Sequence, residues 1–298
     1  MKRKTTVLIT GCSPGGIGYA LAVAFHRRGC HVIATARRDV LGDLADMGMS
    51  TLRLDVTDAA SVAACKDDVA KMTDCKLDIL VNNAGFFYCM PALDYDVDEA
   101  KRLFDTNLFG TMRMCQALSG LLIAARGLII NTSSVSSKLP APFHSVYAAS
   151  KAAMNAYSDV LRVEMEPLGV RVMVTITGSV QSHVYDGPPT SLPAGSRYEP
   201  AREYFQRALK AADNIRLCPP MPAERYAEHV AGKTLPKGWR RRLLGGTPHS
   251  VWKGGGATRT WLLDRVGLSW LTSWAMLISL PPGPSWDLLR RSVRAKAS

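Results

Sequence analysis

The first 28 residues of the chain restrict its fold more than any other segment. Thr5-Thr-Val-Leu-Ile-Thr10 is a short apolar, β-branched run without alternation, which is the pattern of a strand buried on both faces. The glycine-rich segment Gly11-Cys-Ser-Pro-Gly-Gly-Ile-Gly18 follows at once, and residues 19–28 have the apolar spacing of a helix. A strand, a glycine loop and a helix in this order predict a dinucleotide site, because the backbone can approach a pyrophosphate at the free N–H groups of the helix.

Strand and helix patterns continue to alternate along the chain. Strands are expected at residues 31–36, 78–82, 127–132 and 170–176, and helices at 59–72, 105–125 and 146–168. Such alternation is typical of a parallel sheet wrapped by helices, and 298 residues with 47% hydrophobic content can bury that sheet in one domain. We predict an α/β doubly wound parallel sheet, the Rossmann fold, over residues 1–246, and a basic, Trp-rich C-terminal extension over residues 247–298.

A tyrosine and a lysine stand one helical turn apart in Ser145-Val-Tyr-Ala-Ala-Ser-Lys151. Positions i and i+4 share a helix face, and an ammonium placed there lowers the pKa of a phenol from its ordinary value of about 10. Ser134 follows a predicted strand, where its hydroxyl can share a bound substrate oxygen with the phenol. The pattern predicts a proton-transfer site of Ser134, Tyr147 and Lys151.

Five motifs in register make the chain resemble the short-chain dehydrogenase/reductase family over about residues 5 to 246. They are the glycine loop, Asn82-Asn-Ala-Gly85, Asn107 within Asp105-Thr-Asn-Leu-Phe-Gly110, Asn131-Thr-Ser-Ser134, and Tyr147 with Lys151. The resemblance implies that Tyr147 protonates a carbonyl oxygen while Lys151 lowers the pKa of that tyrosine and holds the nicotinamide ribose. It also implies that Ser134 hydrogen-bonds the substrate oxygen and that Asn107 holds a water leading to Lys151.

The resemblance also implies which residues bind the cofactor. Asp55 is expected to meet the adenine amino group, and Asn83 to Gly85 are expected to line the adenosine ribose. Taken singly, Asp55 also fits a helix cap, Asn82 and Asn83 fit turn formers, and Asn107 fits a buried amide at a helix bend. The expected cofactor set is Gly11, Ser13, Gly16, Ile17, Gly18, Arg37, Asp55, Val56, Asn83, Ala84, Gly85, Tyr147, Lys151, Gly178 and Val180.

The end of the second predicted strand bears on the choice of dinucleotide. Ala36 stands where an acidic residue would accept hydrogen bonds from the ribose of NAD, and Arg37-Arg38 follow directly. Arginine suits a 2′-phosphate, although two solvated arginines at a helix start are the alternative interpretation. We expect NADPH (NADP⁺) as the cofactor, with Arg37 at the 2′-phosphate.

Two departures from the family pattern bear on the branch of the family. The glycine loop has one residue more than the commonest form between Gly11 and Gly16, and Thr177-Gly178 stands where the family usually has Pro-Gly. Both look like the fungal and yeast 1-acyldihydroxyacetone-phosphate reductase branch. The expected reaction is reduction of a ketone on a hydrophobic substrate, with an acyldihydroxyacetone phosphate as one candidate. A ketoreductase of fungal secondary metabolism, acting on a polyketide or terpenoid ketone, and a non-redox isomerase or cyclase are the alternatives.

The sequence identifies the substrate-binding residues less clearly than the cofactor-binding residues. Residues 179–197 are rich in Pro and Gly, as in a lid, and a helix is expected at 201–212. Arg197 and Arg202 are candidates for contact with a substrate phosphate, and His144 and His183 for tuning substrate binding. Apolar residues follow the predicted strands at 78–82 and 127–132, at the edge of the sheet where ligands bind, and they favour a hydrophobic ketone as the substrate. They are Phe86, Phe87, Tyr88, Met90, Leu139 and Phe143.

Positive charge is concentrated near the C-terminus. Residues 221–298 hold 13 Lys or Arg and 4 Asp or Glu, a net charge of +9 out of +12. Within them, residues 266–282 are uncharged and include Trp270 and Trp274, but the stretch is shorter than the roughly 20 residues of a spanning helix. A peripheral membrane contact and a helix covering its own domain or a partner subunit both fit this pattern. Nucleic acid does not, because no recognition module accompanies the charge.

The remaining expectations concern metal, location and assembly. The seven cysteines are widely spaced, without a Cys-x-x-Cys pair or a His/Cys cluster, which indicates reduced thiols and predicts no metal site. Met1-Lys-Arg-Lys4 runs directly into the first strand and leaves no room for a signal peptide, so the expected location is cytoplasmic. A membrane contact would place the protein on the endoplasmic reticulum or on lipid droplets. The family resemblance implies a homodimer or homotetramer.

Overall fold

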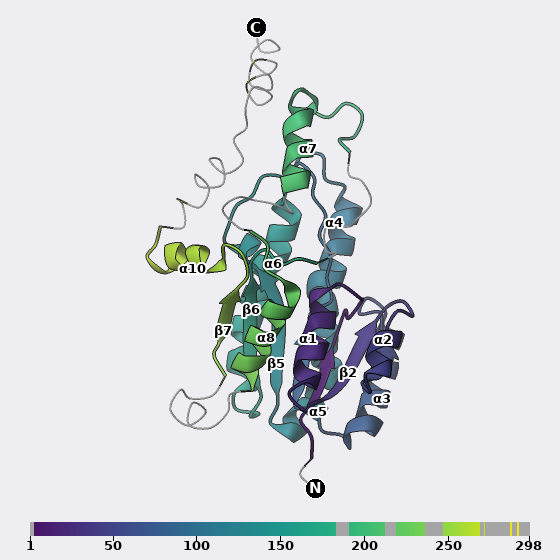
Figure 1. Ribbon diagram of the computed structural model, residues 1–298. Helices are drawn as coiled ribbons and strands as arrows, with labels where there is room; N and C mark the ends of the chain where they lie inside the picture. Colours follow the sequence, from purple (N-terminus) through teal and green to yellow (C-terminus); the bar gives the residue numbers. More distant parts are fainter. Residues whose placement is uncertain are drawn as a thin grey trace.

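Seven parallel strands form the centre of the molecule (Figure 1). They are β1 (Thr6–Ile9), β2 (His31–Ala36), β3 (Ser50–Arg53), β4 (Ile79–Asn82), β5 (Leu128–Ser134), β6 (Arg171–Thr177) and β7 (Ser250–Lys253). Their order across the sheet is β3-β2-β1-β4-β5-β6-β7, which is the doubly wound α/β sheet that the sequence predicts. The computed structural model describes residues 3–182, 191–211, 219–235 and 247–268, together with residues 271, 287 and 291.

Strand β1 carries a continuous apolar run because both faces of the sheet are covered. Val7, Leu8 and Ile9 of β1 have no exposed surface. Alternate side chains of a strand point to opposite faces, so Val7 and Ile9 enter one hydrophobic cluster and Leu8 enters the other. A parallel sheet between two layers of helices requires this continuous apolar pattern.

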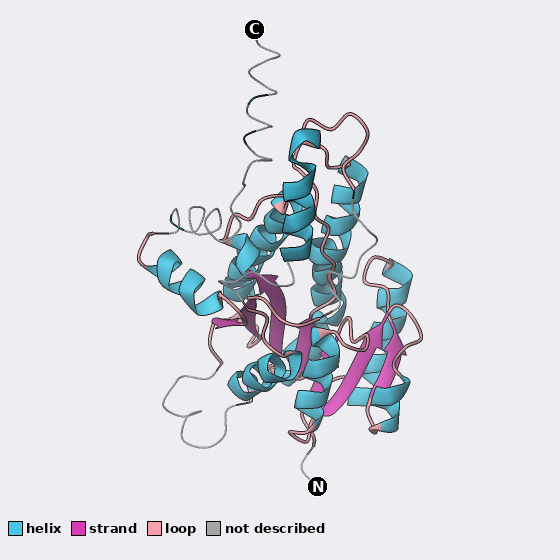
Figure 2. Ribbon diagram, turned by 45° about the horizontal axis from the view of Figure 1, so that its top comes forward, coloured by secondary structure: helices cyan, strands magenta, loops and turns pink. Residues whose placement is uncertain are grey.

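Helices cover both faces of the sheet (Figure 2). Packed on one face are α1 (Ile17–His26), α2 (Gly42–Asp46) and α8 (Ala223–Thr234), and on the other are α3 (Ala59–Thr73), α5 (Gly110–Ala125) and α6 (Ser145–Met165). Helices α1 and α8 lie side by side and contribute the buried rings of Phe25 and Tyr226 to one core cluster. Asp58 caps α3, accepting hydrogen bonds from the N–H groups of Ala60 and Ser61. The cap is therefore Asp58, and Asp55 does not have that role.

One long helix carries a local bulge. Helix α4 (Val97–Phe104) continues through a π turn, Asp105–Phe109, into α5, so the helix expected at 105–125 begins eight residues earlier. The whole of Val97–Ala125 is long and apolar enough to span a membrane. Its side chains at Met114, Leu118 and Leu122 are nevertheless at most 1% exposed and fill the core cluster shared with the sheet.

A separate aromatic cluster lies beyond the carboxyl ends of the strands, under α7 (Arg202–Ala211). We call this part of the molecule the cap. It joins α7 and residues 192–201 to the loops that follow β4 and β5, and its buried members include Phe143, Tyr204 and Phe205. Helix α7 corresponds to the helix expected at 201–212. The central part of the expected lid, including His183, lies outside the described residues.

The C-terminal region contributes to the sheet. Strand β7 pairs in parallel with β6, and α10 (Ala257–Arg265) follows it. Gly178 allows the chain after β6 to pass close to the chain after β7, because a β-carbon on Gly178 would lie 2.2 Å from the carbonyl oxygen of Gly255. Most of residues 266–282, with Trp270 and Trp274, lie outside the described residues.

Candidate active site

The glycine loop brings the backbone of β1 close to the start of α1. A β-carbon on Gly18 would lie 2.3 Å from the carbonyl oxygen of Gly11, so only glycine fits there. Gly16 precedes the first turn of α1, and no side chain caps that turn. The first N–H groups of α1 therefore point out of the helix without a capping acceptor, which is the arrangement that binds a phosphate.

Thr10 and Asn83 hold this loop against the end of β4. The Thr10 hydroxyl accepts hydrogen bonds from the N–H groups of Asn83 (3.0 Å) and Ala84 (2.9 Å). The Asn83 side-chain amide donates to the carbonyl oxygens of Thr10 (2.9 Å) and Gly11 (3.1 Å). Asn83 thus shapes the loop backbone through its amide group. Sequence reasoning missed Thr10, although its position directly before the first glycine is a usable signal.

Tyr147 and Lys151 occupy the first turns of α6. The Lys151 ammonium lies 5.7 Å from the centre of the Tyr147 ring and donates a hydrogen bond to the carbonyl oxygen of Thr132 (2.9 Å). Lys151 is 5% exposed, and burial lowers its pKa to about 8. At neutral pH the ammonium is still largely charged, so the phenol lies beside a buried positive charge.

Ser134 ends β5 and is 8% exposed. Its hydroxyl oxygen accepts a hydrogen bond from the N–H of Ser136 (3.1 Å) and donates to the Ser136 hydroxyl (3.2 Å). These contacts fix the orientation of the Ser134 hydroxyl at the end of the strand. Ser134 lines the same pocket as Tyr147 and Lys151, as the sequence predicts.

Asn107 lies in the π turn and is 1% exposed. Its side chain accepts from the N–H of Phe86 (3.0 Å) and donates to the Phe86 carbonyl oxygen (3.0 Å). A β-carbon on Gly85 would lie 2.9 Å from Asn107 Oδ1 and 3.7 Å from Lys151 Nζ, so both atoms face this glycine. Asn107 is therefore a buried amide that braces the loop after β4, at a position adjoining Lys151.

A pocket of about 340 Å³ joins these parts at the carboxyl end of the sheet. Of the predicted site residues, Gly11, Ser13, Gly16, Ile17, Asn83, Ala84, Gly85, Ser134, Tyr147, Lys151, Gly178 and Val180 line it. Five predicted residues, Gly18, Arg37, Asp55, Val56 and Asn107, do not line it. Sequence reasoning did not select Pro14, Arg38, Thr132, Ser133, Thr177 and Ser182, which also line the pocket.

The two arginines after β2 are placed differently. Arg38 lines the pocket, whereas Arg37 contributes positive charge near Asp55. Burial would raise the pKa of Asp55, but hydrogen bonds from Thr57 and the charges of Arg37 and Arg53 outweigh it and hold the pKa below its usual value. Both arginines are exposed.

The threonine that replaces the usual family proline has its own partner. Thr177 ends β6, and its hydroxyl is 2.7 Å from the hydroxyl of Tyr226 in α8. Burial raises the pKa of Tyr226, so this phenol stays protonated at neutral pH. The substitution thus fixes the end of β6 to a helix on one face of the sheet.

Val56, another residue expected at the cofactor site, is buried, and its carbonyl oxygen accepts a long hydrogen bond from Arg113 (3.4 Å).

Phe87 connects Tyr147 to the cap. Its ring meets Tyr147 edge-on at 5.0 Å and His144 edge-on at 4.7 Å. Nδ1 of His144 is buried without a hydrogen-bond partner, and burial lowers the pKa of this imidazole to about 4. His144 is therefore neutral at physiological pH and packs as an apolar ring behind the loop that carries Phe87.

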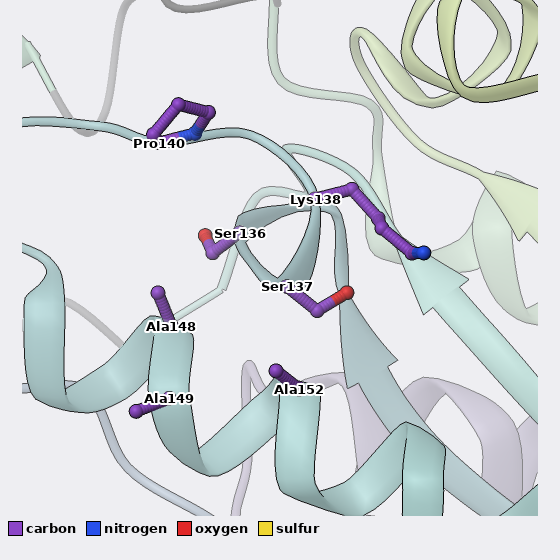
Figure 3. Close-up of a pocket in the computed structure, with 7 residues that line it drawn as sticks. All are labelled: Ser136, Ser137, Lys138, Pro140, Ala148, Ala149 and Ala152. Atoms are coloured by element: carbon purple, nitrogen blue, oxygen red, sulfur yellow. The ribbon is translucent and has the colours of Figure 1, made fainter. Parts of the chain in front are cut away.

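A second hollow of about 500 Å³ lies between the loop after β5 and the first turns of α6 (Figure 3). It is lined by Ser136, Ser137, Lys138, Pro140, Ala148, Ala149 and Ala152. The Ala148 side chain points toward the loop, and the Lys138 side chain points away from the three alanines. The Lys138 ammonium forms an ion pair with Asp264 of α10 (3.5 Å). The hollow thus lies outside the pocket that contains Tyr147.

The chain has close relatives among known proteins. The short chain dehydrogenase family matches residues 5–187. Short-chain dehydrogenase srdE of Neurospora crassa is 42% identical over 234 residues, which are 77% of this chain and 79% of that protein. The NADPH-dependent 1-acyldihydroxyacetone phosphate reductase of Schizosaccharomyces pombe is 37% identical over 262 residues, covering 85% of this chain and 87% of that protein.

Solved structures share the fold over nearly the whole chain. A short-chain dehydrogenase from Streptomyces avermitilis has a TM-score of 0.74 and 26% identity, over 93% of this chain and 97% of that one. A short chain dehydrogenase from Burkholderia cenocepacia in complex with NADP has a TM-score of 0.67 and 23% identity, over 91% and 98% of the two chains. The second likeness concerns the fold alone.

Proposed function

Because the chain belongs to the short-chain dehydrogenase/reductase family of oxidoreductases, we propose that it uses NADPH to reduce a ketone on a hydrophobic substrate to a secondary alcohol. The observation that carries this proposal is the buried ammonium of Lys151 beside Tyr147, in one pocket with Ser134 and the glycine loop. A protein that only bound a nucleotide would not need this acid, its neighbouring cation and a positioned hydroxyl together.

The residues of the pocket fit a dinucleotide. The uncapped first turn of α1 offers N–H groups to a pyrophosphate, and the contact of Gly18 with Gly11 leaves no room for a side chain where the backbone turns. The pocket continues from this loop past Gly85 to Lys151, so it extends from the phosphate end to the catalytic end. When bound, the dinucleotide supplies the hydride.

The protein's own residues would handle the proton. Tyr147 donates a proton to the substrate oxygen, and the Ser134 hydroxyl hydrogen-bonds the same oxygen. The Lys151 ammonium stabilises the tyrosinate that remains after proton donation. The hydrogen bond from Lys151 to the Thr132 carbonyl oxygen and the edge-on contact of Phe87 hold these groups in place.

Support for NADPH over NADH comes from the end of β2. Ala36, which is buried, leaves no carboxylate for a ribose hydroxyl, and Arg37 and Arg38 follow it. Arg38 lines the pocket, so it joins Arg37 as a candidate for the 2′-phosphate. The Schizosaccharomyces pombe relative is described as NADPH-dependent, which agrees with this proposal.

The substrate proposal is supported by the composition of the cap. Phe87 contacts Tyr147, and the cluster behind it contains Met90, Phe143 and Tyr204. These three side chains are buried, so an acyl chain would contact Phe86, which lines the pocket, and Phe87, which contacts Tyr147. The relative that reduces 1-acyldihydroxyacetone phosphate supports that substrate as the first candidate.

A polyketide or terpenoid ketone without phosphate is the second candidate. Arg202, a candidate for the substrate phosphate, is held by Glu199 through two hydrogen bonds of 2.7 and 2.6 Å. Arg197 is exposed at the start of the cap. With Arg202 already paired, an uncharged substrate fits the described part of the cap without rearranging this ion pair.

Members of this family typically form oligomers, and we propose a homodimer or homotetramer here. Large apolar side chains are exposed on one long helix pair, with Phe109 at 46%, Val160 at 59% and Val163 at 74%. An interface that covers these residues would remove apolar surface from water. The mass of the protein in solution, measured by light scattering, tests this proposal, and a monomer would contradict it.

The experiment that tests the function follows NADPH oxidation by the purified protein with acyldihydroxyacetone phosphates, steroid ketones and polyketide-like ketones. Turnover of the phosphate esters alone supports the first candidate, and turnover of the uncharged ketones alone supports the second. NADPH binding without oxidation of any of them would contradict the reductase proposal and favour a non-redox isomerase or cyclase.

A further inference from the structure

Helix α10 exposes an apolar outer face. Trp261 is 40% exposed, Leu262 is 54% exposed, and Val266, directly after the helix, is 55% exposed. Residues three and four apart lie on the same side of a helix, so Trp261, Leu262 and Arg265 share one face. Thr260 on the opposite side is only 4% exposed.

The inner face of α10 is fixed to the enzyme. Ala257 has no exposed surface and packs with Val135, Ile176 and Trp252 in a small hydrophobic cluster. The Lys138–Asp264 ion pair adds a second contact, to the loop that follows Ser134. The exposed face is therefore presented by an anchored helix at the carboxyl end of β7, as Figure 1 shows.

The charge of this region is positive. Arg259 and Arg265 are exposed on α10 next to the apolar side chains. Residues 247–298 together hold seven Lys or Arg and two Asp. The uncharged sequence of residues 266–282 begins where α10 ends and adds Trp270 and Trp274 to the same part of the chain. Tryptophan and leucine interleaved with cations match the headgroup region of an anionic bilayer, where the rings enter the interface and the arginines meet phosphates.

We propose that α10 and the residues immediately after it form a peripheral contact with an anionic lipid surface. Trp261, Leu262, Val266 and Leu268 would enter the interface, and Arg259 and Arg265 would meet the lipid phosphates. The contact lies in the plane of the membrane and requires no spanning segment. It is independent of the identity of the substrate, because none of these residues lines the pocket that contains Tyr147.

The test is sedimentation of the full-length protein with vesicles of phosphatidylcholine, with and without phosphatidylserine. The expected result is binding to the vesicles that contain phosphatidylserine, weakened by added salt. Replacing both arginines (Arg259→Gln with Arg265→Gln) should weaken this binding about thirtyfold, from the loss of two cations at the surface. Replacing the apolar pair (Trp261→Ser with Leu262→Ser) should weaken it at least about tenfold.

The matched control is Leu93→Ser with Val97→Ser, which removes two side chains that are 72% and 67% exposed elsewhere on the surface. This control should bind vesicles as the wild type does. All variants should bind NADPH normally, since the changed residues lie outside the pocket. Light scattering on the same variants tests the alternative, in which a second copy of the chain covers the exposed face of α10.

Two results would overturn the proposal. One is a wild-type protein that fails to sediment with either kind of vesicle. The other is vesicle binding that the α10 variants leave unchanged. A loss of oligomer mass in the Trp261→Ser, Leu262→Ser variant, with no vesicle binding by the wild type, would assign the face to a subunit interface instead.

Discussion

The pocket at the carboxyl edge of the sheet and the cap above it are held in place by different forces. At the edge, backbone hydrogen bonds and buried polar side chains fix the site, as Thr10, Asn83 and Asn107 do for the loops after β1 and β4. In the cap, aromatic rings meet edge-on, as Phe143 does with Tyr204 at 5.6 Å and with Phe205 at 5.2 Å.

This difference suggests that the sheet edge carries the chemistry of the reaction and that the cap determines which substrate binds. Hydrogen-bonded backbone allows little variation, which suits a cofactor and a proton donor whose positions must be kept. Packed rings can be exchanged for others of similar volume, which suits a surface that selects one ketone among many. Changes at the edge should therefore alter catalysis or cofactor affinity, and changes in the cap should alter substrate affinity.

The largest expected effect is on turnover at the edge. Tyr147→Phe keeps the ring that contacts Phe87 but removes the proton donor, so kcat should fall by about a thousandfold. The dissociation constant for NADPH, measured by fluorescence titration, should stay within about twofold. Substantial turnover by this variant would remove Tyr147 from the proton-transfer role.

The next effect is on stability and depends on pH. Lys151 has a pKa of about 8 in the folded protein and an ordinary value of 10.5, so the unfolded chain binds more protons between these values. The free energy of unfolding should therefore rise with pH across this window, by up to about 3 kcal/mol from this group. Below about pH 8 the buried charge destabilises the fold by its full amount.

Lys151→Met isolates that contribution. Urea unfolding of both apoproteins at several pH values gives the difference in the free energy of unfolding between wild type and variant. This difference should shift in favour of the wild type as pH rises from about 8 to about 10.5. A difference that is constant with pH would show that Lys151 keeps an ordinary pKa and is not a desolvated cation.

A smaller effect is expected for the two arginines after β2. Removal of a charged partner of a phosphate costs about tenfold to a hundredfold in affinity. Arg38→Ala and Arg37→Ala should each raise the dissociation constant for NADPH while leaving that for NADH nearly unchanged. An equal loss for both dinucleotides would exclude that arginine from the 2′-phosphate site.

The smallest effect is expected in the cap. The Ser196 hydroxyl donates a hydrogen bond of 2.5 Å to Asp94 and so joins the segment before α7 to the loop after β4. Ser196→Ala should raise KM a few-fold, for about 1 kcal/mol lost, without altering NADPH affinity. The control is Ser119→Ala, on an exposed part of α5. A fall in kcat with an unchanged KM would contradict the expectation that changes in the cap alter substrate affinity and not catalysis.

The sequence predicted the parts of the molecule that local chemistry determines. The apolar runs gave β2 at its observed bounds, His31–Ala36, and the glycine loop and the Tyr147–Lys151 spacing located the pocket. Strand β3, Ser50–Arg53, was missed because its short run is only partly buried and has no continuous apolar pattern. Strand β7, Ser250–Lys253, was missed because only its pairing with β6 identifies it.

Site residues that depend on tertiary contacts were less predictable. Asn107 was selected by its motif, but its hydrogen bonds to Phe86 arise from a π turn that no residue pattern specifies. Arg38 was passed over in favour of Arg37, because adjacent residues point in different directions and the sequence does not reveal which one enters the pocket. The same limit applies to the cap, whose packing joins segments more than 100 residues apart, such as Asp94 and Ser196.

The most direct test of the account follows deuterium from NADPH labelled at the transferred position of the nicotinamide, in the presence of the ketone panel. Mass spectrometry of the products gives the answer. With the wild-type protein we expect a secondary alcohol that carries deuterium on the former carbonyl carbon, and with Tyr147→Phe we expect almost none. A product without deuterium, or equal labelling by the variant, would contradict hydride transfer to a ketone protonated by Tyr147.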